Sequence, residues 1–124
     1  MKKIYNLFSD HEAAPSTHSV ETANRLLPLI QKYTREAVIK SSALMARMES
    51  KPRESSEFQK LAKEYDRVVE RWVERCHRLG AIAKGLWLVD FDTGTGYLCW
   101  SFPEAKVEHF HSYETGFKNR KKIV

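Results

Sequence analysis

The chain has 124 residues, of which 42% are hydrophobic and 30% charged, and its formal net charge is +5. This size and composition predict one soluble domain and leave no room for a second fold. No segment approaches the roughly 18 to 20 apolar residues of a membrane span, and no signal-peptide core follows Met1, so we expect a cytoplasmic protein. Cys76 and Cys99 form no CxxC motif, which excludes the usual zinc and redox signatures.

The first 18 residues are expected to form an arm outside the domain. Ile4, Tyr5, Leu7 and Phe8 make a small apolar patch there, which predicts either an arm that docks on a partner chain or a disordered segment. Residues 19–124 are then a single domain, with a helical hairpin over 19–79 and a β-meander with a basic tail over 80–124.

Apolar residues follow two heptad tracks between Val20 and Leu79, which predicts two helices paired as a long antiparallel, coiled-coil-like hairpin. Pro28 lies inside the first helix and predicts a kink or a restart there. The first track contains Val20, Ala23, Leu27, Ile30, Thr34, Ala37, Ser41, Leu44 and Met48, and the second contains Phe58, Ala62, Tyr65, Val69, Trp72, Cys76 and Leu79.

Polar residues mark the ends of these helices. Ser19 is the expected N-cap of the first helix, and Ser56 with Gln59 has the capping-box spacing at the start of the second. Residues 49–55 contain no apolar side chain and form the expected connecting loop. Gly80 is the expected C-terminal stop.

The apolar surface of the two helices is wider than one seam. A lone hairpin is too thin to bury it, so the C-terminal segment, a second copy of the chain, or both must cover the rest. Of these alternatives we favour a homodimer that completes a four-helix bundle. The expected interface residues are Leu27, Ile30, Val69 and Trp72.

After Gly80 the pattern changes to short apolar runs separated by turn residues. The runs Leu86–Phe91, Tyr97–Phe102 and Val107–His111 predict a three-stranded antiparallel meander. The expected fold class is therefore α+β, with the meander lying against the helices.

Several segments resemble the bacterial family DUF2203, a domain of unknown function, from His18 onward. These segments are His18–Leu29, Leu88–Phe91, Leu98–Trp100, Phe110–His111 and Gly116–Arg120. The chain departs from the family pattern at four places, namely at Thr22, at Trp87-Leu88, at Pro103 and at Phe110. The resemblance implies the fold and a bacterial, cytoplasmic setting, and it implies no activity.

Histidines of the last predicted strand are candidate metal ligands. His109 and His111 share one strand face, so both can reach one ion together with Glu114, and Glu104, Asp90 or Cys99 are possible further ligands. The alternative is structural: His109 lies at the sheet surface, and His111 donates a hydrogen bond that holds the following turn.

The C-terminal segment offers a second candidate site, for an anion or small ligand. Gly116 permits a bend, Phe117 is an anchor or lid, and Arg120 offers a bidentate fork, although Arg120 could equally pair with Asp90 or Glu104. The one nucleophile–base pair in the sequence is Cys99 with His111, and a buried core thiol is the alternative. The full candidate set is Asp90, Cys99, Glu104, His111, Glu114, Gly116, Phe117 and Arg120.

Three functions follow, in order of preference. The first is a non-enzymatic helical interaction or scaffold module that acts as a homodimer and binds a protein partner. The second is a metal- or small-ligand-binding protein, or an enzyme, that uses the C-terminal residues. No cofactor is expected, and a transition metal such as zinc is the alternative. The third is a weak nucleic-acid adaptor, which is disfavoured because acidic residues alternate with the basic ones along the helices.

Overall fold

A computed structural model describes residues 17–123 of the chain. Two helices are followed by five antiparallel strands, which gives an α+β fold. Within the described residues, no helix is long and apolar enough to cross a membrane. The predicted arm lies outside these residues, except for Thr17 and His18, and so does its apolar patch.

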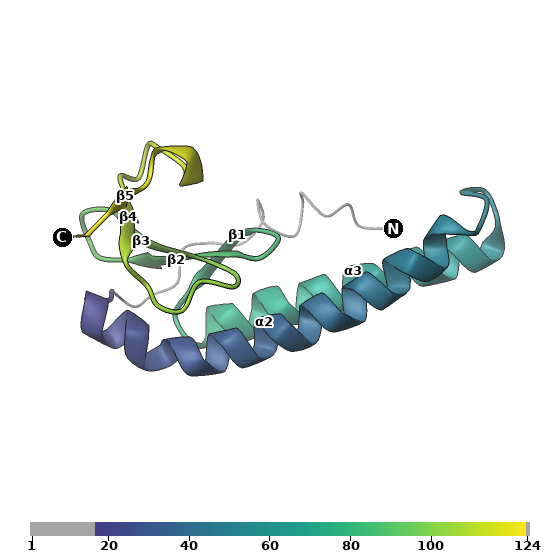
Figure 1. Ribbon diagram of the computed structural model, residues 1–124, viewed down its shortest axis with the longest axis horizontal. Helices are drawn as coiled ribbons and strands as arrows, with labels where there is room; N and C mark the ends of the chain where they lie inside the picture. The colour runs from purple at the N-terminus through teal and green to yellow at the C-terminus, as the bar shows by residue number, and fades with distance from the viewer. Residues whose placement is uncertain (1–16, 124) are drawn as a thin grey trace.

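The helices are α2 (Val20–Glu49) and α3 (Ser56–Arg78), and Figure 1 shows them side by side. Ser19 is the N-cap of α2, as predicted, because its side chain accepts a hydrogen bond from the Thr22 N–H. The N-cap of α3 is Ser55, so the prediction of Ser56 was wrong by one residue. Gly80 follows α3 with a φ of 82°, which favours glycine and ends the helix as predicted.

Pro28 lies inside α2, and the helix continues through it. Figure 1 shows α2 bending in its first third, in place of the break that a restart would give. Proline lacks one hydrogen-bond donor and crowds the preceding turn, which a bend accommodates. We call α2 and α3 together the helix pair.

The sheet has five strands in the order β1-β2-β3-β4-β5, so the predicted three-stranded meander was wrong in strand number. The three predicted strands are present but shorter, and a strand is added at each edge. The missed strands are short: β1 carries a single run of two buried apolar residues, and β5 is two exposed lysines. The bounds are β1 (Ile82–Gly85), β2 (Leu88–Asp92), β3 (Tyr97–Ser101), β4 (His109–His111) and β5 (Lys121–Lys122), with a 3₁₀ helix η1 (Phe117–Asn119) before β5.

One hydrophobic core joins the helix pair to the sheet. Val89, Phe91 and Trp100 point from the sheet into this core and are fully buried. The helix pair covers this face of the sheet, and η1 lies on the opposite side (Figure 1). The polar residues of β2, β3 and β4 therefore lie on the face away from the helices.

The four residues predicted at a dimer interface belong to this core. Leu27, Ile30, Val69 and Trp72 are 2%, 0%, 0% and 1% exposed within a single chain. These four heptad residues are therefore buried by the other helix and the sheet of the same chain, and they offer no surface to a second copy.

Polar side chains of α2 attach the helix pair to the sheet. The Asn24 amide donates to the carbonyl oxygen of Val107 over 3.0 Å and accepts from its N–H over 2.8 Å. The Gln31 amide donates to the Glu104 and Ala105 carbonyls, both at 3.3 Å. These contacts hold the connection between β3 and β4 against α2, and they fix the position of Glu104.

The Ser19 cap gives a first prediction. We expect Ser19→Ala to lower the free energy of unfolding by about 1 kcal/mol, because the Thr22 N–H loses its acceptor at the helix end. Ser42→Ala is the matched control, since Ser42 is exposed on the same helix. Urea unfolding followed by circular dichroism measures both, and equal stability of the two variants would contradict the assigned cap.

Candidate functional site

Three candidate residues meet on the polar face of the sheet. Asp90 of β2 lies directly opposite Cys99 of β3, and His111 of β4 reaches the same place from the next strand. One ligand atom from each, a carboxylate oxygen, the thiol sulfur and an imidazole nitrogen, lie within 4.8 Å of one another. The three residues are 1%, 0% and 5% exposed. We call Asp90, Cys99 and His111 the buried triad.

Hydrogen bonds define the protonation of the His111–Asp90 pair. Nδ1 of His111 lies 2.8 Å from the carbonyl oxygen of Ser112, which can only accept, so Nδ1 carries a proton. Nε2 lies 3.0 Å from Oδ2 of Asp90. One proton is therefore shared between Nε2 and Oδ2, and the imidazole is held in one orientation.

Burial controls the acidity of the triad. Desolvation raises the pKa of Asp90, and the neighbouring His111 opposes this. Burial, reinforced by the Asp90 carboxylate, also raises the pKa of the Cys99 thiol to about 12. Cys99 is therefore a neutral thiol at neutral pH, and the site does not activate it as the nucleophile of a Cys99–His111 pair.

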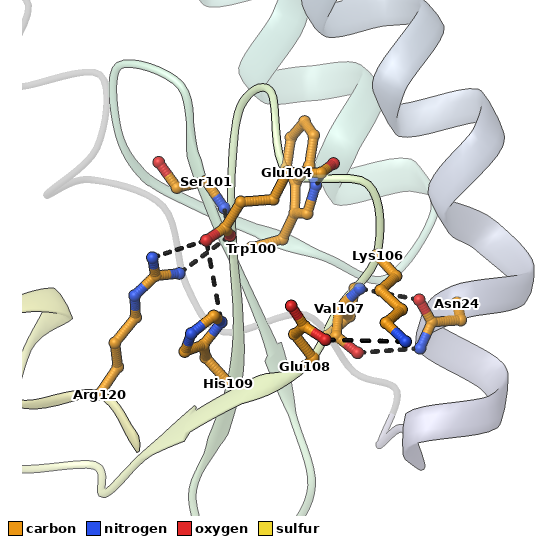
Figure 2. A network of polar contacts seen from close by, with 9 residues as sticks. All are labelled: Asn24, Trp100, Ser101, Glu104, Lys106, Val107, Glu108, His109 and Arg120. Carbon is orange, nitrogen blue, oxygen red and sulfur yellow. Dashed lines mark hydrogen bonds and ion pairs between the residues drawn. The ribbon is translucent and has the colours of Figure 1, made fainter. Parts of the chain in front are cut away.

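A second polar cluster lies at the end of the same face and is centred on Glu104 (Figure 2). Its carboxylate accepts two hydrogen bonds from Arg120, over 2.9 and 2.6 Å, and one from the Ser101 N–H over 2.8 Å. Nδ1 of His109 lies 3.8 Å from Oε2 of Glu104. The Arg120 guanidinium also stacks on the Phe117 ring at 4.2 Å. Arg120 is therefore paired internally, which is the alternative that the sequence left open.

The remaining candidates do not join either cluster as ligands. Glu114 is exposed and lies outside the group of possible metal ligands, and His109 faces Glu104, so the predicted set of His109, His111 and Glu114 is not assembled. Gly116 precedes η1 at an ordinary negative φ, and Phe117 is occupied by Arg120. Of the predicted ligand site at the C-terminal segment, Arg120 thus pairs with Glu104 and stacks on Phe117, whereas Glu114 and Gly116 are exposed.

The helix pair carries a different feature, a groove of about 390 Å³ between α2 and α3. Its floor is apolar and its rim is mainly basic. Glu36 pairs with Arg75 over 3.4 Å, and Arg75 lies over the Tyr33 ring. The lining residues are Tyr33, Glu36, Ala37, Lys40, Ala43, Leu44, Arg47, Glu64, Arg67, Val68, Arg71, Trp72 and Arg75. We call this the basic groove.

Four cations of the basic groove have no partner among residues 17–123. The side chains of Lys40, Arg47, Arg67 and Arg71 are exposed and make no ion pair or hydrogen bond there. A neighbouring groove of about 400 Å³ shares Arg47 and Glu64 and extends to the loop between the helices. Sequence reasoning missed these residues and read them as an ordinary solvated surface. The available signal was the four-residue spacing of Arg67, Arg71 and Arg75 beside the buried heptad track.

The fold and its polar clusters define an α+β protein in which a helix pair lies against a small antiparallel sheet. The chain belongs to the family described as uncharacterized conserved protein (DUF2203), whose model matches residues 16–123. The match confirms the family predicted from the motifs. Neither the curated proteins nor the solved structures gave a match.

Proposed function

We propose that this protein is a non-enzymatic interaction module whose basic groove binds an acidic amphipathic helix of a partner protein. The observation that carries the proposal is the set of four unpaired cations around an apolar floor. A helix laid in this groove would bury apolar residues on Leu44 and Val68 and place carboxylates against the rim.

The charge of the groove selects the chemistry of the partner. Five cations and two carboxylates line it, and one carboxylate is already paired with Arg75. An acidic helix therefore gains attraction from both rims, whereas a basic helix is repelled. The remaining acidic residue, Glu64, favours a partner that carries a basic residue at one position.

A nucleic acid fits the groove less well. Proteins that bind single-stranded nucleic acids stack the bases on exposed aromatic side chains. Trp72 is 1% exposed, and the Tyr33 ring is covered by Arg75. The apolar floor also offers nothing to a phosphate backbone, so the third function remains the weakest of the three.

Homodimerisation is not needed for this proposal. The coiled-coil pairing of the heptad tracks is proposed to act within one chain, since most of their residues are buried there. A bacterial origin and a cytoplasmic location stay predictions.

Charge reversal tests the proposal. The probe is a synthetic helical peptide with leucines on one face and glutamates on the others, and its matched control carries lysines in place of the glutamates. We expect the acidic peptide to bind and Arg67→Glu/Arg71→Glu to weaken binding at least tenfold, because both changes oppose the peptide charge. Arg35→Glu/Lys63→Glu alters the net charge equally at exposed positions outside the groove and should change affinity about twofold at most.

Fluorescence anisotropy gives the affinities, and amide chemical shifts locate the bound peptide. Equal weakening by the two double variants would mean that only net charge matters and would contradict a groove site. Binding of duplex RNA with a steep salt dependence, together with no binding of the acidic peptide, would replace the proposal with the nucleic-acid function.

A further inference from the structure

The buried triad has the composition of a metal-binding site. A carboxylate, a thiol and an imidazole are the side chains that zinc takes as ligands. Their ligand atoms come from three adjacent strands and lie within 4.8 Å of one another. We infer that Asp90, Cys99 and His111 bind a divalent cation of the zinc type.

An unpaired carboxylate oxygen supports this inference independently. Oδ1 of Asp90 is fully buried and has no hydrogen-bond partner among the described residues. A buried carboxylate oxygen without a partner is costly, and a cation would satisfy it. Together with Sγ of Cys99 and Nε2 of His111, an oxygen of Asp90 would give three protein ligands, and a water molecule would complete the four-coordinate site that zinc prefers.

The imidazole is already oriented for a metal. Nδ1 of His111 donates to the Ser112 carbonyl, which directs Nε2 toward the Asp90 carboxylate. Metal-binding histidines are commonly held by such a hydrogen bond from the second ring nitrogen to a backbone carbonyl. His111 therefore presents the correct nitrogen.

The charges of the site also balance. On binding, the Cys99 thiol proton and the proton shared by Asp90 and His111 leave to solvent. Two negative ligands and one neutral imidazole then neutralise a divalent ion, which suits a buried site. Arg120 lies near Cys99 and would oppose a cation, but its guanidinium is paired with both oxygens of Glu104.

Burial predicts how the ion enters. The three residues are at most 5% exposed, so an ion reaches them when the sheet forms or opens. The test therefore uses the full chain, stripped with chelator and then both titrated in the folded state and refolded from guanidinium with Co(II). Co(II) is the probe because thiolate ligation gives a charge-transfer band in the near ultraviolet, which Zn(II) should abolish by competition.

We expect one equivalent of Co(II) per chain and a thiolate band that Cys99→Ser removes. Asp90→Asn and His111→Gln should weaken binding at least tenfold, whereas the controls His109→Gln and Glu114→Gln should bind like the unchanged chain. The Co(II) titration of the unchanged chain tests whether the site binds metal even if a triad variant fails to fold. No thiolate band in either preparation, or a band that survives Cys99→Ser and disappears in Cys76→Ala, would overturn the assignment.

Discussion

Trp72→Ala is expected to lower the free energy of unfolding by about 3–5 kcal/mol, the largest single effect that the structure predicts. The Trp72 ring is 1% exposed and packs edge-on against Trp87, with 4.9 Å between ring centroids. Its Nε1 donates to Oγ1 of Thr34 over 2.8 Å. Truncation therefore opens a cavity between α2, α3 and the sheet and removes the one side-chain hydrogen bond of this indole.

Urea unfolding at several protein concentrations measures the effect. Trp72→Phe keeps most of the ring volume and should cost about 1–2 kcal/mol, and the exposed neighbour change Glu74→Ala should cost less than about 0.5 kcal/mol. Since Trp72 is buried within one chain, the loss should not depend on protein concentration. If the unchanged chain were a dimer and Trp72→Ala a folded monomer, Trp72 would instead lie at the predicted dimer interface.

The helices could be predicted from the sequence because their signal is long. The heptad tracks repeat over about 60 residues, and Ser19 and Gly80 mark two of the ends, so the bounds agree with the structure to within a residue or two. What the periodicity could not decide is what covers each track. Trp72 has the same spacing whether it packs on its own chain or on a second copy.

The sheet edges could not be predicted because they carry little sequence signal. β5 consists of Lys121 and Lys122, and pairing with β4 alone makes them a strand. A single short apolar run, as in β1, is equally typical of a loop that touches the core. Strand number therefore depended on tertiary pairing, which no local pattern reports.

The sequence named the residues of the two clusters as candidates but left their pairings open, as with Asp90 or Glu104 as the partner of Arg120. Asp90 and Cys99 meet because of strand register, and Glu104 meets Arg120 because the segment after His111 returns to the sheet. Register and loop path cannot be read from a list of polar residues. The same limit hid the basic groove, since its rim combines cations from two helices that the sequence separates by about 30 residues.

The Glu104–Arg120 pair gives the second large prediction. We expect Arg120→Gln to lower the free energy of unfolding by about 2 kcal/mol at neutral pH, because two charge-assisted hydrogen bonds are lost. The Glu104 and Arg120 side chains are only 25% and 17% exposed, which limits screening by water. Removing Arg120 also frees the Phe117 ring, which stacks on it.

A double-mutant cycle separates the pair from its surroundings. Glu104→Gln keeps the size of the side chain and an acceptor for the Ser101 N–H but loses the charge. Glu104→Gln, Arg120→Gln and the double variant should give a coupling of about 1–2 kcal/mol at neutral pH. Additive effects, with no coupling, would show that the pair adds nothing beyond its two separate side chains.

The coupling should disappear in acid. Burial acts to raise the pKa of Glu104, but hydrogen bonds from Arg120 and the Ser101 N–H outweigh it and lower that pKa below its usual 4.5. A carboxylate whose pKa is lower in the folded state stabilises the fold above its unfolded pKa, and this stabilisation is lost as the pH falls through the folded value. The stability difference between the unchanged chain and Glu104→Gln should therefore be constant near neutral pH and should shrink below about pH 4.5. A difference that stays constant into acid would show that the Glu104 charge contributes no stability, and the contribution of the site would then rest on its neutral hydrogen bonds alone.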